Sequence, residues 1–338
     1  MPKTLIFIST HIINNAVISE YKKMLKVENA DCILAIDNTN LKIPFENRIT
    51  EKEFFGIQVK CFFFDKDVHN EINLPWFTEK NHTNNFVEVM WHNSDYRFYY
   101  VKKYFPDYNY YWQFEYDIYC NGDSYQPFFD KYSDRKEDLL ILNFREEKHN
   151  GEWFWSYNRT DWLYKDKKIY GGFFPIVRLT AKAVDFLYNQ RLVHKNIFEK
   201  LENKTNSTWI FCELFIATEI INNGFTAYNM QEPQIRYLPE YDLNEERLYE
   251  NPDNMLYHPI KGMFIERQNK LNTANEELKE EIKELKSEKI LLEKQNEELT
   301  ANVKLLINKN KKQKKKIKKL SVTKLNLFGI KISHKRKA

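Results

Sequence analysis

The fold of this chain of 338 residues is decided by residues 110–123, which read Tyr-Tyr-Trp-Gln-Phe-Glu-Tyr-Asp-Ile-Tyr-Cys-Asn-Gly-Asp. The aromatic run indicates a buried strand that carries Glu115 and Asp117 at its carboxyl end, and the last three residues predict a turn. In open α/β sheets, ligands bind at that end of the strands. Two carboxylates one residue apart can hold a hard divalent cation, with phosphate oxygens completing its coordination shell. The alternative is a solvated strand face, or pairing of the two acids with nearby lysines.

Strands and helices alternate on either side of this stretch. Apolar runs at residues 5–8, 32–36 and 59–64 predict strands that end in polar or acidic residues, and residues 16–26 predict a helix after the first. Strand, helix and strand at this spacing predict a parallel, doubly wound α/β sheet. Residues 66–90 are interpreted as a polar connection. Beyond them we expect helices at 95–104, 180–191 and 208–221, strands at 138–143 and 226–230, and a strand or loop at 169–177.

The composition argues against several classes of protein. Only 8 glycines occur, and neither a GxGxxG nor a Walker pattern is present, which disfavours glycine-loop nucleotide folds. The 4 cysteines form no CxxC pair, so they predict reduced thiols rather than a zinc site or a disulfide framework. The apolar run near the N-terminus is too short for a signal peptide, and no run of about 18 apolar residues predicts a membrane span. We therefore expect a cytoplasmic protein.

The C-terminal part of the sequence follows a seven-residue repeat. Leucine recurs at every seventh residue from Leu271 to Leu306 and again at Leu320, and the interleaved positions hold Ile, Val, Asn and Lys. This pattern predicts a coiled coil over residues 265–320, with self-association through residues 271–320. Asparagine at interleaved positions favours a parallel dimer. A single helix folded back on the globular part is the alternative.

Charge is distributed unevenly along the chain. Residues 303–338 hold 14 Lys and Arg and no acidic residue, which leaves a net charge of −10 in the first 302 residues. Lysines beside the apolar cluster at 325–332 suit an anionic membrane surface. We expect residues 321–338 to form a basic amphipathic tail, and residues 309–337 to bind peripherally to the inner face of the cell membrane. A solvated, disordered tail is the alternative. Nucleic acid is not expected, because aromatic residues for base stacking are almost absent there.

Polar residues that follow the predicted strands are candidates for binding a nucleotide. Thr10 and His11 follow the first strand and Asp37 ends the second, where a nucleoside would lie. Asp95 and Arg97 begin the helix before the acidic strand. Arg97 can meet a phosphate or pair with Asp95, and both interpretations stay open.

Residues in the second half of the globular part are candidates for the acceptor side and for the chemistry. Glu213 interrupts the apolar run 209–217, and a carboxylate there is costly unless it is paired or used. It predicts either a general base that deprotonates a hydroxyl or a buried ion pair. Trp153 and Trp155 can form a platform for a sugar ring or belong to the core. His258 can supply a late contact to a metal or a phosphate, or be an ordinary histidine.

Four segments together carry a resemblance to a known family. They read Trp-Gln-Phe-Glu-Tyr-Asp-Ile-Tyr at 112–119, Tyr-Gly-Gly-Phe-Phe-Pro-Ile-Val-Arg-Leu-Thr at 170–180, Cys-Glu-Leu-Phe at 212–215 and Tyr-His-Pro-Ile-Lys at 257–261. Over about residues 4–262 the chain resembles bacterial GT-A-fold glycosyltransferases of the surface-polysaccharide (capsule or lipopolysaccharide) type. Its acid-x-acid triplet begins with Glu, where that family usually has Asp.

The resemblance implies a fold, an activity and a set of site residues. It implies a GT-A-like, doubly wound mixed sheet with flanking helices in residues 1–264, made of a nucleotide-binding half (1–123) and an acceptor half (124–264). It implies a nucleotide-sugar donor, with Mn²⁺ or Mg²⁺ at Asp117 and Glu115. Gly171 and Gly172 would line the acceptor side, and Glu213 would be the base of an inverting transfer to a lipid-linked or surface-polysaccharide hydroxyl. A coiled coil with a basic end is also seen on such enzymes, which it dimerises at the inner leaflet.

Two other functions stay open beside the metal-dependent glycosyltransferase that we expect. The first is a scaffold tethered to the membrane by its basic tail, in which the coiled coil does the work and the α/β domain is merely folded. The second is a nucleotidyltransferase, which shares the acid-x-acid logic. Such an enzyme needs a grip on a triphosphate, and the sequence has no Gly- and Lys/Arg-rich loop for one.

Overall fold

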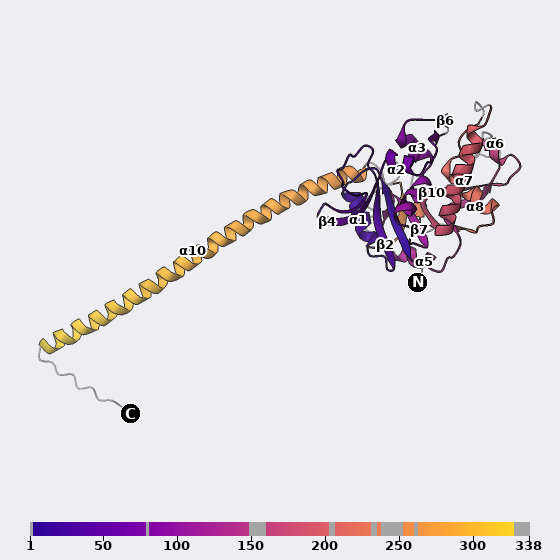
Figure 1. The fold of residues 1–338 in the computed structure, drawn as a ribbon. Coiled ribbons are helices and arrows are strands. Elements are labelled where there is room, and N and C mark those ends of the chain that lie inside the picture. The colour runs from indigo at the N-terminus through magenta and orange to yellow at the C-terminus, as the bar shows by residue number, and fades with distance from the viewer. Residues whose placement is uncertain are drawn as a thin grey trace. The chain divides into compact units, whose positions relative to one another are not determined.

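The computed structural model describes residues 3–78, 81–148, 160–202, 207–230, 235–237, 253–259 and 263–327. Its contacts divide the chain into two compact units, Met1–Gln268 and Asn269–Ala338. The first unit contains a mixed α/β sheet with its helices, and the second contains most of the long helix α10 (Met263–Leu327) (Figure 1). Each unit is described by itself below.

The central sheet of the first unit has eight strands. They are β1 (Thr4–Thr10), β2 (Ala30–Asp37), β3 (Ile49–Phe54), β4 (Ile57–Phe64), β7 (Tyr110–Glu115), β9 (Leu139–Glu147), β10 (Ile169–Thr180) and β11 (Ala227–Met230). Their order is β11-β9-β10-β7-β1-β2-β4-β3. Most neighbours are parallel, but β10 is antiparallel to both β7 and β9, and β3 is antiparallel to β4. The sheet is therefore mixed.

Both faces of this sheet are covered. Alternate residues of β1 enter two different apolar clusters, with Leu5 and Phe7 on one face and Ile6 and Ile8 on the other. Burial on both faces explains why the strands read as unbroken apolar runs. The first face is covered by α2 (Lys66–Glu71), α3 (Phe86–His92), α4 (Tyr96–Tyr104), α7 (Ala181–Glu199) and α8 (Cys212–Asn222), and the second by α1 (Asn15–Met24) and α5 (Gln126–Tyr132).

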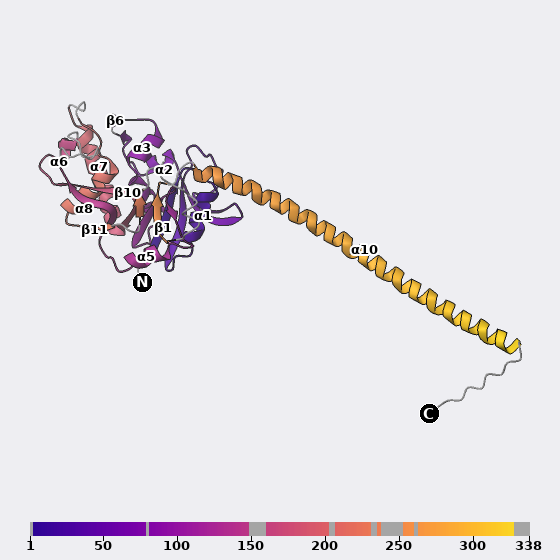
Figure 2. The same ribbon diagram turned by 180° about the vertical axis from the view of Figure 1, so that it is seen from behind.

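Figures 1 and 2 show α7 and α8 beside one another at the β10–β11 end of the unit, and α1 at the end of β2 and β4. The short helix α6 (Asp161–Tyr164) lies near α7 in both views. Asn14 caps α1 by accepting a hydrogen bond from the amide of Val17, and Thr180 caps α7 in the same way by accepting from the amide of Ala183. The expected α/β class, a doubly wound mixed sheet followed by a long C-terminal helix, is confirmed.

Two of the differences from the predicted elements lie between residues 49 and 92. Residues 66–90 are not a plain connection, because they form α2, the short hairpin of β5 (Phe77–Thr78) and β6 (Asn81–His82), and the start of α3. The edge strand β3 was not expected either. Its sequence, Ile-Thr-Glu-Lys-Glu-Phe, alternates exposed and half-buried side chains and carries charges that are typical of a sheet edge. It therefore lacks the apolar run that predicted the central strands.

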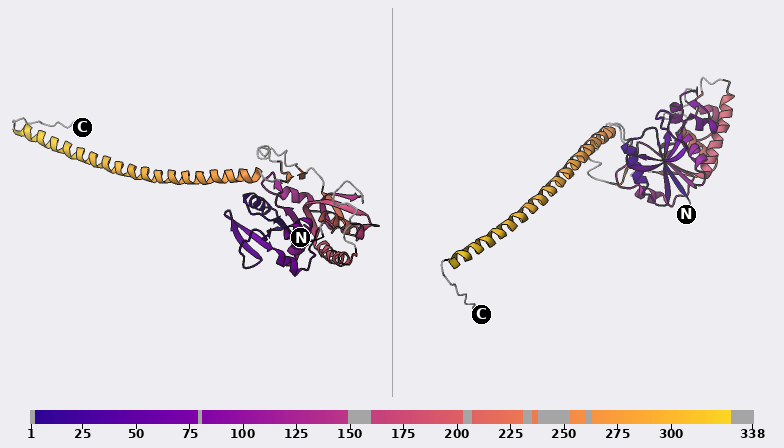
Figure 3. Two further views of the ribbon diagram at one scale, coloured as in Figure 1. Left: turned by 90° about the horizontal axis from the view of Figure 1, so that it is seen from above. Right: turned by 60° about the vertical axis from the view of Figure 1, so that its left-hand side comes forward.

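The helix α10 is one continuous helix of 65 residues (Figure 3). At about 1.5 Å of rise per residue it is roughly 100 Å long. All side chains described in it, from residue 278 to residue 320, are exposed, and they include the leucines at positions 278, 285, 292, 299, 306 and 320. The coiled coil over 265–320 stays a prediction, as do the boundaries at 123, 264 and 320. Among the helices that the structure describes, none is long and apolar enough to cross a membrane.

Candidate active site

Three ionisable side chains converge beside the end of β7. Nε2 of His258 lies 3.5 Å from a carboxylate oxygen of Glu115 and 3.5 Å from one of Asp117. One potential ligand atom from each of the three residues lies within 4.8 Å of the other two. Asp117 and His258 are almost fully buried, at 5% and 7% exposed. The structure thus brings His258, which is far away in the sequence, next to the predicted acidic pair.

The turn after β7 explains how His258 reaches the two acids. Residues Leu256–His258 form β13, which pairs antiparallel with β8 (Tyr119–Cys120) and parallel with β12 (Ile235–Tyr237). A β-carbon at Gly122 would lie 2.3 Å from the side-chain oxygen of Asn254, so a larger residue there would require the Asn254 side chain to move. The amide of Asn121 also donates to the carbonyl of Met255 at 2.9 Å. The Asn121-Gly122 turn therefore holds His258 against the acidic pair.

The electrostatics of the cluster favour positive charge. Burial alone would lower the pKa of His258, but hydrogen bonds to Asp117 and Glu115 and the charges of both outweigh it and raise the pKa to about 9. Two carboxylates and an imidazole are ligands that Mn²⁺ accepts, and carboxylates also suit Mg²⁺. Neighbouring ligands of a cation bound at about 2.1 Å lie roughly 3 Å apart. The 3.5 Å separations are close to that value, so the three residues fit a divalent cation.

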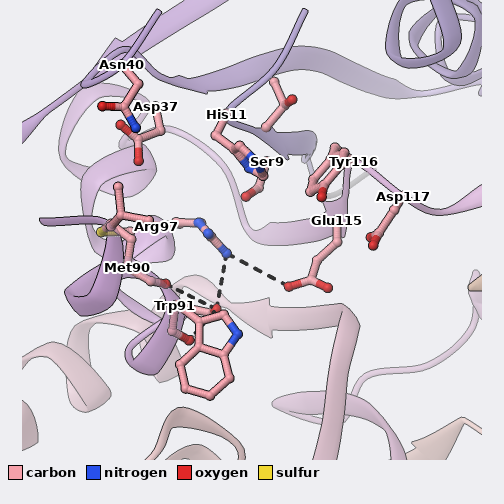
Figure 4. A pocket seen from close by; sticks show the side chains of 13 residues that line it. Ser9, His11, Asp37, Asn40, Met90, Trp91, Arg97, Glu115, Tyr116 and Asp117 are labelled. Atoms are coloured by element: carbon pink, nitrogen blue, oxygen red, sulfur yellow. Dashed lines mark hydrogen bonds and ion pairs between the residues drawn. The ribbon is translucent and has the colours of Figure 1, made fainter. Parts of the chain in front are cut away.

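A pocket opens next to this cluster, at the carboxyl ends of β1, β2 and β7. Ser9 of β1 pairs in register with Glu115 of β7, and the order of the sheet reverses between these two strands. This is the position at which open α/β sheets bind their ligands. Six residues that the sequence predicts for the site line the pocket: Thr10, His11, Asp37, Arg97, Glu115 and Asp117. Figure 4 labels all of these except Thr10.

Arg97 and Asp95 have different surroundings, although they start the same helix. A guanidinium nitrogen of Arg97 donates to the hydroxyl of Ser94 at 3.1 Å and lies 4.0 Å from Glu115. Its Nε atom is buried and has no hydrogen-bond partner among the described residues, so Arg97 has a donor left for an anionic ligand. Arg97 does not pair with Asp95 in the structure.

Asp95 does not line the pocket. Both of its oxygens accept hydrogen bonds at 2.8 Å from Arg191, which is fully buried, and Tyr99 donates to one of them at 2.7 Å. The third guanidinium nitrogen of Arg191 donates to the carbonyl of Ile210 at 2.9 Å. The ion pair thus connects α4 and α7 with the segment before α8. This structural role explains why a carboxylate is buried at position 95, and no contact with a donor nucleotide is needed to explain it. For this reason the structure does not support Asp95 as a residue that binds the donor.

Glu213 lies in the first turn of α8 and is 7% exposed. One of its oxygens accepts a hydrogen bond from the amide of Phe174 on β10 at 3.3 Å. Burial raises the pKa of Glu213 to about 8, and the negative charge of Glu115 contributes to that rise. No cation pairs with Glu213 in the part of the chain that the structure describes. Among the described residues, the contact that holds this carboxyl group is the hydrogen bond from the Phe174 amide, and its role as a base or in an ion pair stays a prediction.

The structure adds a wall to the pocket that the sequence did not predict. Val87, Met90, Trp91 and Ser94 line the pocket from α3 and from the turn that follows it. Their spacing of three and four residues places them on one helical face. The signal was present in the Asn85-Phe-Val-Glu88 pattern, which is typical of a helix start, and Asn85 indeed caps α3. Asn40 and Tyr116 also line the pocket, and nothing in their local sequence singles them out.

Comparisons with known proteins place the fold in a wider context. No protein-family model matches this chain, and no curated protein sequence matches it. Its fold is similar to that of mouse xyloside xylosyltransferase 1 in the apo form, with 11% identity and a TM-score of 0.42 over 76% of this chain and 97% of that one. It is also similar to a putative glucose-1-phosphate thymidylyltransferase from Bacillus anthracis in complex with a sucrose, with 11% identity and a TM-score of 0.33 over 68% and 86%. Neither likeness bears on what this chain binds.

The two glycines predicted for the acceptor side do not line the pocket. Gly171 and Gly172 are buried in β10, at a point where its register with β9 shifts. A β-carbon at Gly172 would lie 2.7 Å from the side chain of Ile141, so close packing against β9 accounts for this glycine. Trp153 and Trp155 fall outside the residues that the structure describes.

Proposed function

We propose that this protein is a metal-dependent glycosyltransferase that moves a sugar from a nucleotide-sugar donor to a hydroxyl of a lipid-linked or surface-polysaccharide acceptor. One observation carries the proposal. Glu115, Asp117 and His258 form a cluster that fits a divalent cation, beside a pocket at the point where the strand order reverses. Phosphates would be repelled by two carboxylates without such a cation, and the first 302 residues are acidic overall. A cation bound there would stabilise the charge that develops on the departing diphosphate.

The pocket residues have distinct roles in this proposal. Asp37 and Asn40, at the end of β2, are placed to bind the nucleoside. Thr10 fixes the turn after β1, because its hydroxyl donates to the carbonyl of Ile12 at 2.5 Å and accepts from the amide of the same residue at 3.1 Å. His11 packs edge-on against Tyr116 at 4.7 Å. Arg97 supplies the cationic donor for a diphosphate oxygen.

Glu213 is the base in the proposed reaction. The acceptor hydroxyl oxygen bonds to the anomeric carbon of the donor sugar, and the bond from that carbon to the diphosphate oxygen breaks. The nucleoside diphosphate leaves with the electron pair, and the hydroxyl proton passes to the Glu213 carboxylate. A base with a pKa near the working pH suits this step, and burial brings the pKa of Glu213 to about 8. Attack opposite the leaving group would invert the anomeric configuration.

The C-terminal part has a proposed role in location rather than in chemistry. The exposed leucines of α10 repeat every seven residues, which favours association with a second copy of the chain as a parallel dimer. The 8 lysines at positions 309–319 favour binding to an anionic membrane surface. The enzyme would then act at the inner face of the cell membrane, where lipid-linked acceptors lie.

A donor screen tests the proposed function. The purified protein is incubated with UDP-, GDP-, CDP- and dTDP-linked hexoses and Mn²⁺, and release of the nucleoside diphosphate is measured. We expect slow, metal-dependent release from one class of donor, and loss of that release in Asp117→Asn. If no donor is turned over or bound with any divalent cation, the proposal is wrong and the scaffold function gains support.

A further inference from the structure

An aromatic side chain stands exposed at the wall of the candidate pocket. Trp91 of α3 is 57% exposed and lines the pocket, and Val87, one turn earlier on the same helix, is 46% exposed. Met90 lies between them on the same face and is buried. The pocket lining is otherwise mostly polar or charged. This face of α3 thus gives the pocket one apolar wall.

The backbone of Trp91 is hydrogen-bonded to a residue beside Arg97 and Glu115, two charged side chains of the pocket. The hydroxyl of Ser94 donates to the carbonyl of Trp91 at 3.4 Å and accepts from Arg97, which in turn lies 4.0 Å from Glu115. Figure 4 shows Trp91 near Arg97 and Glu115, while Asp37 and Asn40 lie at another side of the pocket. In this view the indole lies on the Glu115 side of Arg97, and Asp37 and Asn40 lie on the other side.

Trp91 also connects this end of the pocket to the proposed base. Its ring meets the ring of Phe211 edge-on, with 5.4 Å between the ring centroids. Phe211 is the N-cap residue of α8, and Glu213 lies in the first turn of that helix. The indole thus lines the same pocket as Glu115 and Asp117 and also packs against the residue two positions before Glu213. In the proposed reaction the two sugars meet between the metal cluster and Glu213, so a sugar would pass near the indole.

We propose that Trp91 is a stacking platform for a pyranose ring, which belongs either to the donor sugar or to the acceptor. The inference rests on the proposed function and adds the sugar subsite to it. A pyranose presents C–H groups on one face and hydroxyls around its edge. The apolar face can cover the indole and bury its exposed surface, while the hydroxyls reach the polar residues around it. A nucleobase could also stack on indole, but in the proposed function the nucleoside binds near Asp37 and Asn40, which lie at another side of the pocket.

Calorimetry with ring-deletion variants tests the platform. UDP, GDP, CDP and dTDP, and their hexose conjugates, are titrated with Mn²⁺ into the wild type, Trp91→Ala and Trp91→Phe. Leu25→Ala, which removes an apolar side chain that is 51% exposed outside the pocket, is the matched control. If the ring belongs to the donor, Trp91→Ala weakens binding of the hexose conjugate about tenfold and leaves the bare diphosphate unchanged. Trp91→Phe keeps most of the affinity.

A second titration separates the donor sugar from the acceptor. Methyl glucoside, galactoside and mannoside are titrated into the protein saturated with Mn²⁺ and the diphosphate that binds best. If the ring belongs to the acceptor, Trp91→Ala weakens binding of a methyl glycoside about tenfold while the conjugates bind as before. If Trp91→Ala leaves the affinity for both the hexose conjugates and the methyl glycosides unchanged, the platform proposal is wrong, although the proposed function stands. If the wild type binds no nucleoside diphosphate at all, the proposed function fails, and the platform fails with it.

Discussion

Nε2 of His258 lies 3.5 Å from Oδ1 of Asp117, although the two residues are far apart in the sequence. Glu115 lies at the same distance from the same nitrogen. The small sheet formed by β8, β12 and β13 creates this relationship, because it brings β13 back beside the turn after β7. The cluster is the feature of the fold on which the proposed chemistry depends.

Loss of one carboxylate from the cluster should abolish strong cation binding. We expect Asp117→Asn to weaken Mn²⁺ affinity by at least tenfold, and His258→Ala to weaken it as well, because each removes one of the three convergent ligands. Asp123→Asn, which changes an exposed acid on the neighbouring turn, is the control. Calorimetric titration of Mn²⁺ gives the affinities, and circular dichroism checks the fold. Equal affinity in Asp117→Asn and Asp123→Asn would refute the metal assignment.

The buried carboxyl of Glu213 should make stability depend on pH. Its pKa of about 8 in the folded protein lies above the ordinary value of 4.5, so ionisation disfavours the folded state. The stabilising contribution of the protonated group is complete below pH 4.5 and is lost as the pH rises through 8. Glu213→Gln cannot ionise and keeps the acceptor for the Phe174 amide.

The comparison of Glu213→Gln with the wild type therefore has a defined sign. The variant should gain stability relative to the wild type as the pH rises from 5 to 9, by about 4 kcal/mol over this range, because the pKa of Glu213 is raised from 4.5 to about 8 and each pKa unit corresponds to about 1.4 kcal/mol. Urea unfolding in the presence of a chelator measures the difference. A constant difference across this range would mean that the group is already ionised in the folded protein at pH 5.

The Asp95–Arg191 pair should be essential for stability. Arg191→Met leaves the carboxylate of Asp95 buried and uncompensated, which costs about 3–5 kcal/mol in comparable cases. The unfolding midpoint in urea should fall accordingly. Lys168→Met, which breaks an exposed pair with Glu146, should leave the midpoint in place. Equal effects of the two substitutions on the midpoint would show that the buried pair does not stabilise the fold more than an exposed pair does.

The heptad face of α10 should mediate self-association. Leu292→Asp places a charge at a position that the repeat assigns to the interface, whereas Ser287→Asp places the same charge on the opposite side of the repeat. We expect sedimentation velocity to show a dimer for the wild type and for Ser287→Asp, and a shift to monomer for Leu292→Asp. If the wild type is already monomeric at micromolar concentration, the coiled-coil proposal is wrong.

The basic end should control membrane binding. A chain that ends after Lys304 lacks the lysine-rich segment 309–319. It should no longer sediment with vesicles that contain phosphatidylserine, and the full chain should lose binding as the salt concentration rises. Vesicles of phosphatidylcholine alone are the control. Retained binding of the shortened chain would refute the proposed anchor.

Much of the fold followed from the sequence because its central strands are buried on both faces. Runs such as Leu5–Ile8 have no other stable environment, and their polar ends mark the edge of the sheet where Thr10, Asp37 and Glu115 meet. Interactions across the fold could not be predicted. The partner of Asp95 is Arg191, on a helix with no local link to it, and the contact between Gly172 and Ile141 depends on a register shift between β9 and β10.

The wall of the pocket escaped prediction for a different reason. Helix α3 has only seven residues, and its apolar residues face both the core and the pocket, so no clean amphipathic pattern arises. Most of α3, from Phe86 to Met90, therefore appeared to be part of a polar connection. The capping pattern at Asn85 and Glu88 was the one local signal of a helix there.

The central claim is that the cluster of Glu115, Asp117 and His258 binds a nucleotide through a divalent cation. Calorimetric titration of nucleoside diphosphates into the full chain, with Mn²⁺ and then with a chelator, tests it most directly. We predict saturable heat for at least one diphosphate in the presence of Mn²⁺, and its loss with the chelator and in Asp117→Asn. Heat that is unchanged by the chelator, or no heat with any diphosphate, would contradict the claim.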